Sequence, residues 1–90
     1  MEKIWLPHYP AGVPHEVDVA AYASIFDVFT QSCTRYRERP AFASLGTRMT
    51  YGELDRLSRD FAAYLQTHCG LVKGDRLAIM LPNVLQYPVA

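Results

Sequence analysis

Apolar residues recur at three- and four-residue steps in two parts of the chain, which is the spacing of one face of an α-helix. The first pattern begins at Ser24, which has the spacing of a capping pair with Asp27, and it ends before Pro40. We therefore predict a helix that starts at Ser24. Its inner face is expected to consist of Ile25, Val28, Phe29, Ser32, Cys33 and Tyr36.

The second pattern has clear start and stop residues. Thr50 and Glu53 have the spacing of a capping box, and Met49 and Leu54 occupy the two positions of a hydrophobic staple. Gly70 is the expected left-handed residue at the end of this helix. The buried stripe is predicted to be Leu54, Leu57, Phe61, Ala62 and Leu65.

Two short strands are predicted between these helices, at residues 41–45 and 48–50. Gly46 and Thr47 would form the two-residue loop of a hairpin. A glycine in the first loop position favours a type II′ turn, because glycine accepts a positive φ without a steric cost.

The last part of the chain has a different pattern. A turn at Lys73-Gly74-Asp75 precedes the uninterrupted apolar run Leu77 to Leu81. A strand that is apolar on both faces is typical of a parallel sheet covered by helices on each side. Asn83 could then cap a third helix with Gln86 as its reciprocal partner, or that helix could start later because of Pro88.

The first 23 residues contain three prolines, Pro7, Pro10 and Pro14, and are expected to form an irregular arm. Residues 24–90 read as helix, hairpin, helix, buried strand and the start of a helix. This order predicts the beginning of an α/β domain. Its strand would need neighbours from outside these elements.

Composition limits the function classes. With 90 residues, half of them hydrophobic, the chain is one small domain or part of a larger one. Nine basic residues balance nine acidic ones, so no charge pattern indicates a nucleic acid or an anionic membrane surface as partner. Cys33 and Cys69 are expected to be free, mostly buried thiols in a reducing compartment. No secretory signal or membrane span is evident, so a cytoplasmic chain is expected.

The chain carries no recognisable catalytic constellation. Its five glycines are scattered over turns and caps, so no loop is built to hold phosphates. His8, His15 and His68 have no metal-ligand spacing with one another or with the cysteines. Three arginines near the end of the first helix could bind phosphate, although a solvated helix end is favoured; they are Arg35, Arg37 and Arg39. We therefore predict no catalytic, cofactor-binding or metal-binding residue.

The stretch TYGELDRLSRDFAAYLQTHCGLVKGDRLAIMLPN, residues 50–83, resembles the N-terminal part of the adenylate-forming (AMP-binding) enzymes. The start KIWLPHYPAGVPHEVDVAAYASIFDVF and the end MLPNVLQYPVA are similar to bacterial long-chain fatty acid–CoA ligases in particular. The resemblance implies an N-terminal fragment of the large domain of such a ligase. Thr50, Glu53, Gly74, Asp75 and Asn83 match family positions, for which only structural roles are expected.

The resemblance also implies the chemistry of a longer parent enzyme. That enzyme would convert a fatty acid, ATP and coenzyme A into acyl-CoA, AMP and pyrophosphate with the help of magnesium. The ATP-gripping loop, the hinge and the small-domain lysine of the family have no counterpart in this sequence. The fragment itself is therefore expected to be inactive and to bind no cofactor. The parent could associate peripherally with the inner face of the inner membrane.

Two partners could complete the exposed apolar strand: the remainder of the ligase chain, or another copy of the fragment. We expect a contact between copies to include Ile79, Leu81 and the segment of residues 83–90. The alternative is a monomer in which the arm of residues 5–13 folds back over the strand. A self-standing interaction or oligomerisation module derived from this family is the alternative to a ligase fragment.

Overall fold

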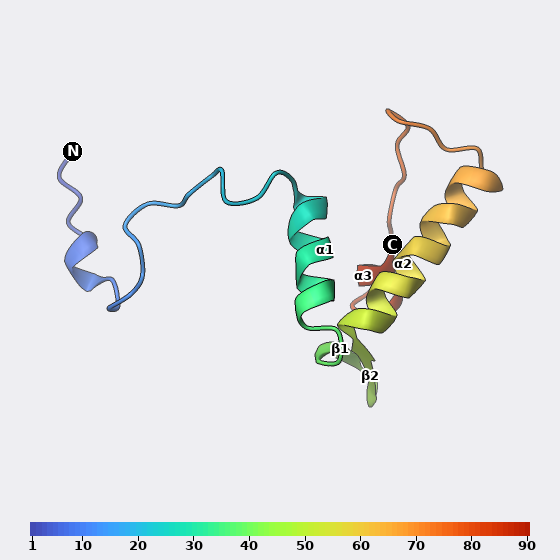
Figure 1. Ribbon diagram of the computed structural model, residues 1–90, viewed down its shortest axis with the longest axis horizontal. Helices are drawn as coiled ribbons and strands as arrows, with labels where there is room; N and C mark the ends of the chain where they lie inside the picture. The colour runs from blue at the N-terminus through green and yellow to red at the C-terminus, as the bar shows by residue number, and fades with distance from the viewer.

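A computed structural model describes residues 1–90. The elements follow one another as a 3-10 turn η1 (Leu6–His8), helix α1 (Ile25–Arg35), strands β1 (Pro40–Ser44) and β2 (Thr47–Thr50), helix α2 (Tyr51–Thr67) and a short helix α3 (Gln86–Val89). Figure 1 shows α1 and α2 leaving the hairpin on the same side, with α3 and the C-terminus beside α2. The molecule therefore combines helices with a two-stranded antiparallel sheet, a mixed α/β arrangement.

The N-terminal arm stands apart from the rest of the molecule, on the far side of α1 from α2 (Figure 1). Its contacts are internal: the Tyr9 and His15 rings meet edge to face at 5.7 Å, and Lys3 Nζ lies 3.6 Å from Glu16 Oε1. Apart from the single turn η1, residues 1–23 form no helix or strand. The alternative in which this arm covers residues 77–81 is wrong in this structure, because none of its residues packs against that segment.

Both long helices begin with the caps that the sequence predicts. Ser24 Oγ accepts a hydrogen bond from the N–H of Asp27 at 3.0 Å. In α2, Thr50 Oγ1 accepts from the N–H of Glu53 at 3.1 Å, and Glu53 Oε2 accepts from the N–H of Thr50 at 2.9 Å. These bonds satisfy backbone donors that a helix N-terminus leaves free. At the other end of α2, Gly70 has a φ of 68°, as expected for a left-handed stop.

The hairpin is confirmed, but its turn differs from the prediction. Ser44 pairs with Thr47, so the loop residues are Leu45 and Gly46, with φ values of 50° and 79°. Two successive positive φ values define a type I′ turn rather than type II′. A type I′ turn matches the twist of the strands, and that gain outweighs the cost of placing a leucine at positive φ.

Only three residues are buried: Cys33 in α1 at 3% exposure, Met49 in β2 at 7% and Leu54 in α2 at 3%. They mark a small core where α1, the hairpin and α2 meet. Cys33 and Leu54 belong to the predicted inner faces, and Met49 and Leu54 are the predicted staple. The prediction fails for Ile25, Val28 and Ala62, which are exposed in this structure.

The predicted strand at Leu77 to Leu81 is absent. These residues are exposed and have no regular structure, because no neighbouring strand is available to pair with them. Asn83 does not cap a helix. Helix α3 starts at Gln86, and its N-cap Leu85 makes no side-chain hydrogen bond. This is the later start that Pro88 requires, since Pro88 then lies in the first turn.

Candidate functional site

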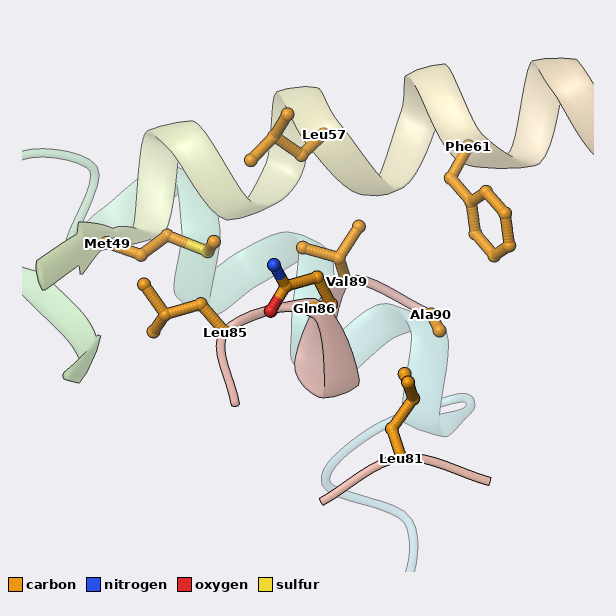
Figure 2. Close-up of a pocket in the computed structure, with 8 residues that line it drawn as sticks. All are labelled: Met49, Leu57, Phe61, Leu81, Leu85, Gln86, Val89 and Ala90. Atoms are coloured by element: carbon orange, nitrogen blue, oxygen red, sulfur yellow. The ribbon is translucent and has the colours of Figure 1, made fainter. Parts of the chain in front are cut away.

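The main concave feature is an apolar groove of about 610 Å³ between α2 and the C-terminal segment. Figure 2 shows Met49, Leu57 and Phe61 on one side of this space, facing Leu85 and Val89. Its complete lining is Met49, Leu57, Phe61, Leu81, Leu85, Gln86, Val89 and Ala90. We call this feature the apolar groove.

Local structure explains why these side chains face one another. Leu57 and Phe61 are four residues apart and share one face of α2. Leu81, Leu85 and Val89 repeat the four-residue step on the other side. A hydrogen bond of 3.3 Å from Ser44 Oγ in β1 to the carbonyl oxygen of Asn83 ties the hairpin to the C-terminal segment, and α3 packs against α2.

The lining determines what the groove can do. It contains no acid, base, thiol or hydroxyl, and Gln86 is its single polar side chain. Proton transfer and nucleophilic attack need such groups within hydrogen-bond reach of the substrate. The groove can therefore bind apolar groups by removing them from water, but its own side chains supply no catalysis.

A smaller hollow of about 290 Å³ lies between α1, α2 and the chain end, next to the ion pair of Asp55 and Arg59. Arg59 Nε lies 2.9 Å from Asp55 Oδ1. Burial raises the pKa of the nearby Cys33 thiol, the negative charge of Asp55 raises it further, and Arg59 partly offsets both effects. The thiol is thus held in its protonated, unreactive form at neutral pH.

The residues that match family positions have structural surroundings. Thr50 and Glu53 form the capping box of α2. The turn before residue 77 is closed by Asp75, whose carboxylate accepts from the N–H of Val72 at 2.9 Å, while Gly74 has a φ of 102°. Asn83 contributes the carbonyl that Ser44 binds. None of these five family-matching residues shares a site with a histidine in the structure.

The arginines at the end of α1 surround an aromatic ring. The guanidinium carbons of Arg35 and Arg39 both lie 5.4 Å from the centre of the Tyr36 ring, a cation–π distance. The Tyr36 ring lies 5.9 Å from that of Tyr51. Two of the three arginines therefore pack on Tyr36 near the junction of α1 and α2. All three arginines are exposed, as the favoured solvated helix end predicts.

Sequence reasoning missed the apolar groove. The four-residue spacing of Leu81, Leu85 and Val89 could have revealed it, but the run Leu77 to Leu81 was assigned to a strand and Leu85 to a separate helix. The cysteines were predicted only in part. Both thiols are free, but Cys33 is buried and Cys69 is exposed.

The apolar groove offers no charged side chain to a phosphate or to magnesium. No group of three histidine, cysteine, aspartate or glutamate side chains lies close enough to hold a metal ion. The glycines lie in separate turns and at helix ends, so they do not form a single glycine-rich loop. None of the helices combines the length and hydrophobicity needed to cross a membrane.

Comparison with known proteins identifies the family. The AMP-binding enzyme family matches residues 29–90. The chain is 54% identical over all 90 residues to a long-chain-fatty-acid–CoA ligase of Escherichia coli O6:H1, and 52% identical over the same length to one of Yersinia pestis. It is 35% identical over 85 residues to a long-chain-fatty-acid–CoA ligase of Bacillus subtilis. No solved structure matches.

The chain belongs to the family of AMP-binding enzymes. The resemblance to bacterial long-chain fatty acid–CoA ligases, stated above from residues 50–83 and the two ends, is confirmed. The mixed α/β class expected for part of an adenylate-forming enzyme is confirmed as well. The chain covers 16% of the length of the first two relatives, so it corresponds to a small part of each.

Proposed function

We propose that this chain is a structural part of the AMP-binding domain of a long-chain fatty acid–CoA ligase. The observation that carries the proposal is the 54% identity over all 90 residues to a ligase of that name. The reaction of the whole protein would join a fatty acid to coenzyme A, with ATP converted to AMP and pyrophosphate. ATP, magnesium and coenzyme A would be held by residues outside this chain.

The role of these residues would be to build and orient the domain. Two capped helices joined by a hairpin would serve as a frame, and the apolar groove offers a surface on which further elements can pack. The absence of an acid, base or nucleophile from the groove supports a scaffolding role. The division into an arm (residues 1–23) and the start of the AMP-binding domain (residues 24–90) remains a prediction.

The proposed place of action is the cytoplasm. The whole ligase handles long acyl chains and would dock peripherally on the inner face of the membrane. The chain itself, with equal numbers of acidic and basic residues, supplies no electrostatic attraction to that surface.

A chimera tests the proposal. The 90 residues of this chain replace the matching stretch of the E. coli ligase, and acyl-CoA formation is measured with a long-chain fatty acid, ATP, magnesium and coenzyme A. We expect activity within about tenfold of the unmodified ligase, which corresponds to about 1.4 kcal/mol. A chimera that folds but shows no long-chain activity, next to an active unmodified ligase, contradicts the proposed function.

A second candidate function is a self-standing interaction module. The open apolar groove favours it, because a large exposed apolar surface marks a site of association. The reading frame that follows Ala90 in the source DNA separates the two functions. Several hundred further codons that encode the ATP-gripping loop support the ligase, and a stop codon supports the module.

A further inference from the structure

The N-terminal arm contains a closed loop that projects from the rest of the molecule. Lys3 Nζ lies 3.6 Å from Glu16 Oε1, and within the loop so closed the rings of Tyr9 and His15 meet edge to face. We call residues 3–16 the arm loop. The molecule is 54 Å long, and η1 lies at one end of its long axis (Figure 1). Because η1 contacts no other helix or strand, the arm loop can approach a flat surface without hindrance from the core.

The contacts that order the arm loop lie within it. Four of its N–H groups each donate to the carbonyl three residues earlier, at 3.0 to 3.2 Å; they belong to Leu6, His8, Tyr9 and Val13. Three prolines restrict the backbone further, because each fixes its own φ. The arm loop therefore needs no contact with the core to keep its turns, and its outer side chains are left available to a partner.

Large apolar side chains of the arm loop are exposed. Ile4 is 72% exposed, Trp5 46%, Tyr9 39% and Val13 47%. Tryptophan and tyrosine combine an apolar ring with a polar N–H or O–H, which suits them to the boundary between lipid and water. Aliphatic side chains beside them add apolar area that a bilayer surface can cover. The arm loop therefore has the composition of a short contact with the surface of a membrane.

The charge of the arm excludes electrostatic attraction as the source of such a contact. Residues 1–23 contain one lysine, Lys3, against three acidic residues, Glu2, Glu16 and Asp18. Attraction to anionic lipids requires an excess of lysine and arginine close to the surface. Binding by the arm loop would instead come from the removal of apolar side chains from water, which salt does not screen.

We propose that the arm loop is an interfacial anchor that inserts Ile4, Trp5 and Val13 into the headgroup boundary of a lipid bilayer. The inference extends the peripheral docking stated in the proposed function and rests on it for its setting. A bilayer is favoured over a protein partner because the arm has no strand edge and no long helix, the elements through which many protein partners bind. Pro7 lies within η1, which is not the extended conformation that proline-binding domains recognise.

Trp5 is the only tryptophan of the chain, so its fluorescence reports on the arm loop alone. When phosphatidylcholine vesicles are added to the 90-residue chain, we expect the emission maximum to move to shorter wavelength. Lipids brominated next to the headgroup should quench this emission, and neither phosphatidylglycerol nor a change in salt should strengthen the binding. A chain that does not bind the vesicles overturns the proposal. Binding that requires phosphatidylglycerol also overturns it, because charge would then be the driving force.

Two variants separate the arm loop from the other exposed apolar part of the chain. The double variant Ile4→Ser with Val13→Ser should weaken partitioning into the vesicles at least about fivefold, because it removes apolar area that the bilayer would cover. Met80→Ser is the matched control, since Met80 is 96% exposed and lies outside the arm, and its partitioning should not change. Circular dichroism checks that both variants keep their helices. Unchanged partitioning of the double variant overturns the proposal, and a loss in Met80→Ser alone assigns the lipid contact to the C-terminal segment instead.

The chimera with the E. coli ligase distinguishes a lipid partner from the ligase polypeptide itself. Without vesicles, the backbone amides of residues 3–16 should exchange with deuterium as fast as in the isolated chain. With phosphatidylcholine vesicles, we expect their exchange to slow at least about tenfold. Protection in the lipid-free chimera would mean that the arm loop packs on the rest of the ligase, which overturns the proposal. A chimera that binds vesicles through the arm loop but forms no acyl-CoA contradicts the proposed function and leaves this inference intact.

Discussion

The N–H of Gly52 donates a hydrogen bond of 2.9 Å to the carbonyl oxygen of Arg37 and so ties the start of α2 to the chain that leaves α1. The preceding N–H, of Tyr51, donates to the carbonyl of Arg39 at 3.1 Å. A Cβ atom on residue 52 would lie 3.2 Å from the Arg37 oxygen and 2.9 Å from its Cγ. The close approach of the two segments therefore depends on a residue without a side chain.

Replacement of this glycine by valine should open the junction. We expect Gly52→Val to lower the free energy of unfolding by about 1–3 kcal/mol, the usual cost of overpacking. Ala63→Val is the control, because it places the same β-branched side chain on an exposed position of α2. Urea unfolding followed by circular dichroism measures both. Equal effects of the two variants would mean that helix propensity, and not the contact with Arg37, determines the cost.

The core residue Leu54 should contribute more to stability than the cap of α2. We expect Leu54→Ala to cost about 2–5 kcal/mol, as for a buried leucine, and Thr50→Ala to cost about 1 kcal/mol through loss of the N-cap. Urea unfolding of the two variants measures the order. If Thr50→Ala is the more damaging change, the small core around Leu54 does not hold α2 in place.

The cost of replacing Leu57 by alanine should differ between the isolated chain and the chimera. Leu57 is only partly buried in the isolated chain, where it lines the open groove. Leu57→Ala should therefore cost less than Leu54→Ala in the chain alone, and a similar amount in the chimera once the groove is covered. Thermal unfolding of both variants in both proteins tests this. An equal cost of Leu57→Ala in the two contexts would show that the groove stays open.

Local signals in the sequence were sufficient for the helices and the hairpin. The capping box of Thr50 and Glu53 and the proline after α1 act over a few residues, so their effect does not depend on the rest of the protein. The turn was assigned one residue too late, because Leu45 gives no sign that it accepts a positive φ. Sequence patterns that span only a few residues therefore predict helices and strands well, but predict the type of a turn less well.

The strand at Leu77 to Leu81 could not form from local information. Its pattern predicts burial on both faces, but a strand exists only when a neighbour supplies hydrogen bonds. Ile25, Val28 and Ala62 are exposed on otherwise correct helix faces because no neighbouring element packs closely against these positions. The apolar groove is not evident from the sequence because its two sides, residues 49–61 and residues 81–90, are far apart along the chain.

The two cysteines should react at very different rates. Cys69 is exposed and Cys33 is buried, so a thiol reagent should label Cys69 in the native chain and Cys33 only after opening. We expect a difference of at least about 100-fold in rate, and equal rates in denaturant. Mass spectrometry of the labelled peptides measures both. Equal labelling of the native chain would contradict the packing of α1 against α2.

The raised pKa of Cys33 links stability to alkaline pH. Because the folded chain holds the Cys33 proton more tightly than the unfolded chain, the stabilisation is complete below the unfolded thiol pKa of about 8.5 and is lost as the pH rises through the folded value. Cys33→Ala should remove this part of the pH dependence, and Cys69→Ala should leave it unchanged. Urea unfolding between pH 7 and about pH 10 compares the slopes.

The isolated chain should form no acyl-CoA from a long-chain fatty acid, ATP, magnesium and coenzyme A. Catalysis of phosphoryl and adenylyl transfer depends on groups that position the phosphates and stabilise their charge. The groove offers only apolar side chains and Gln86, and the arginines Arg35 and Arg39 are stacked on Tyr36. Release of pyrophosphate and formation of thioester are measured with chain purified from a host that lacks its own ligase. The contrary outcome is turnover above the protein-free blank that copurifies with the chain through two unrelated columns. Such activity would show that these 90 residues hold an active site and that the scaffolding role is wrong.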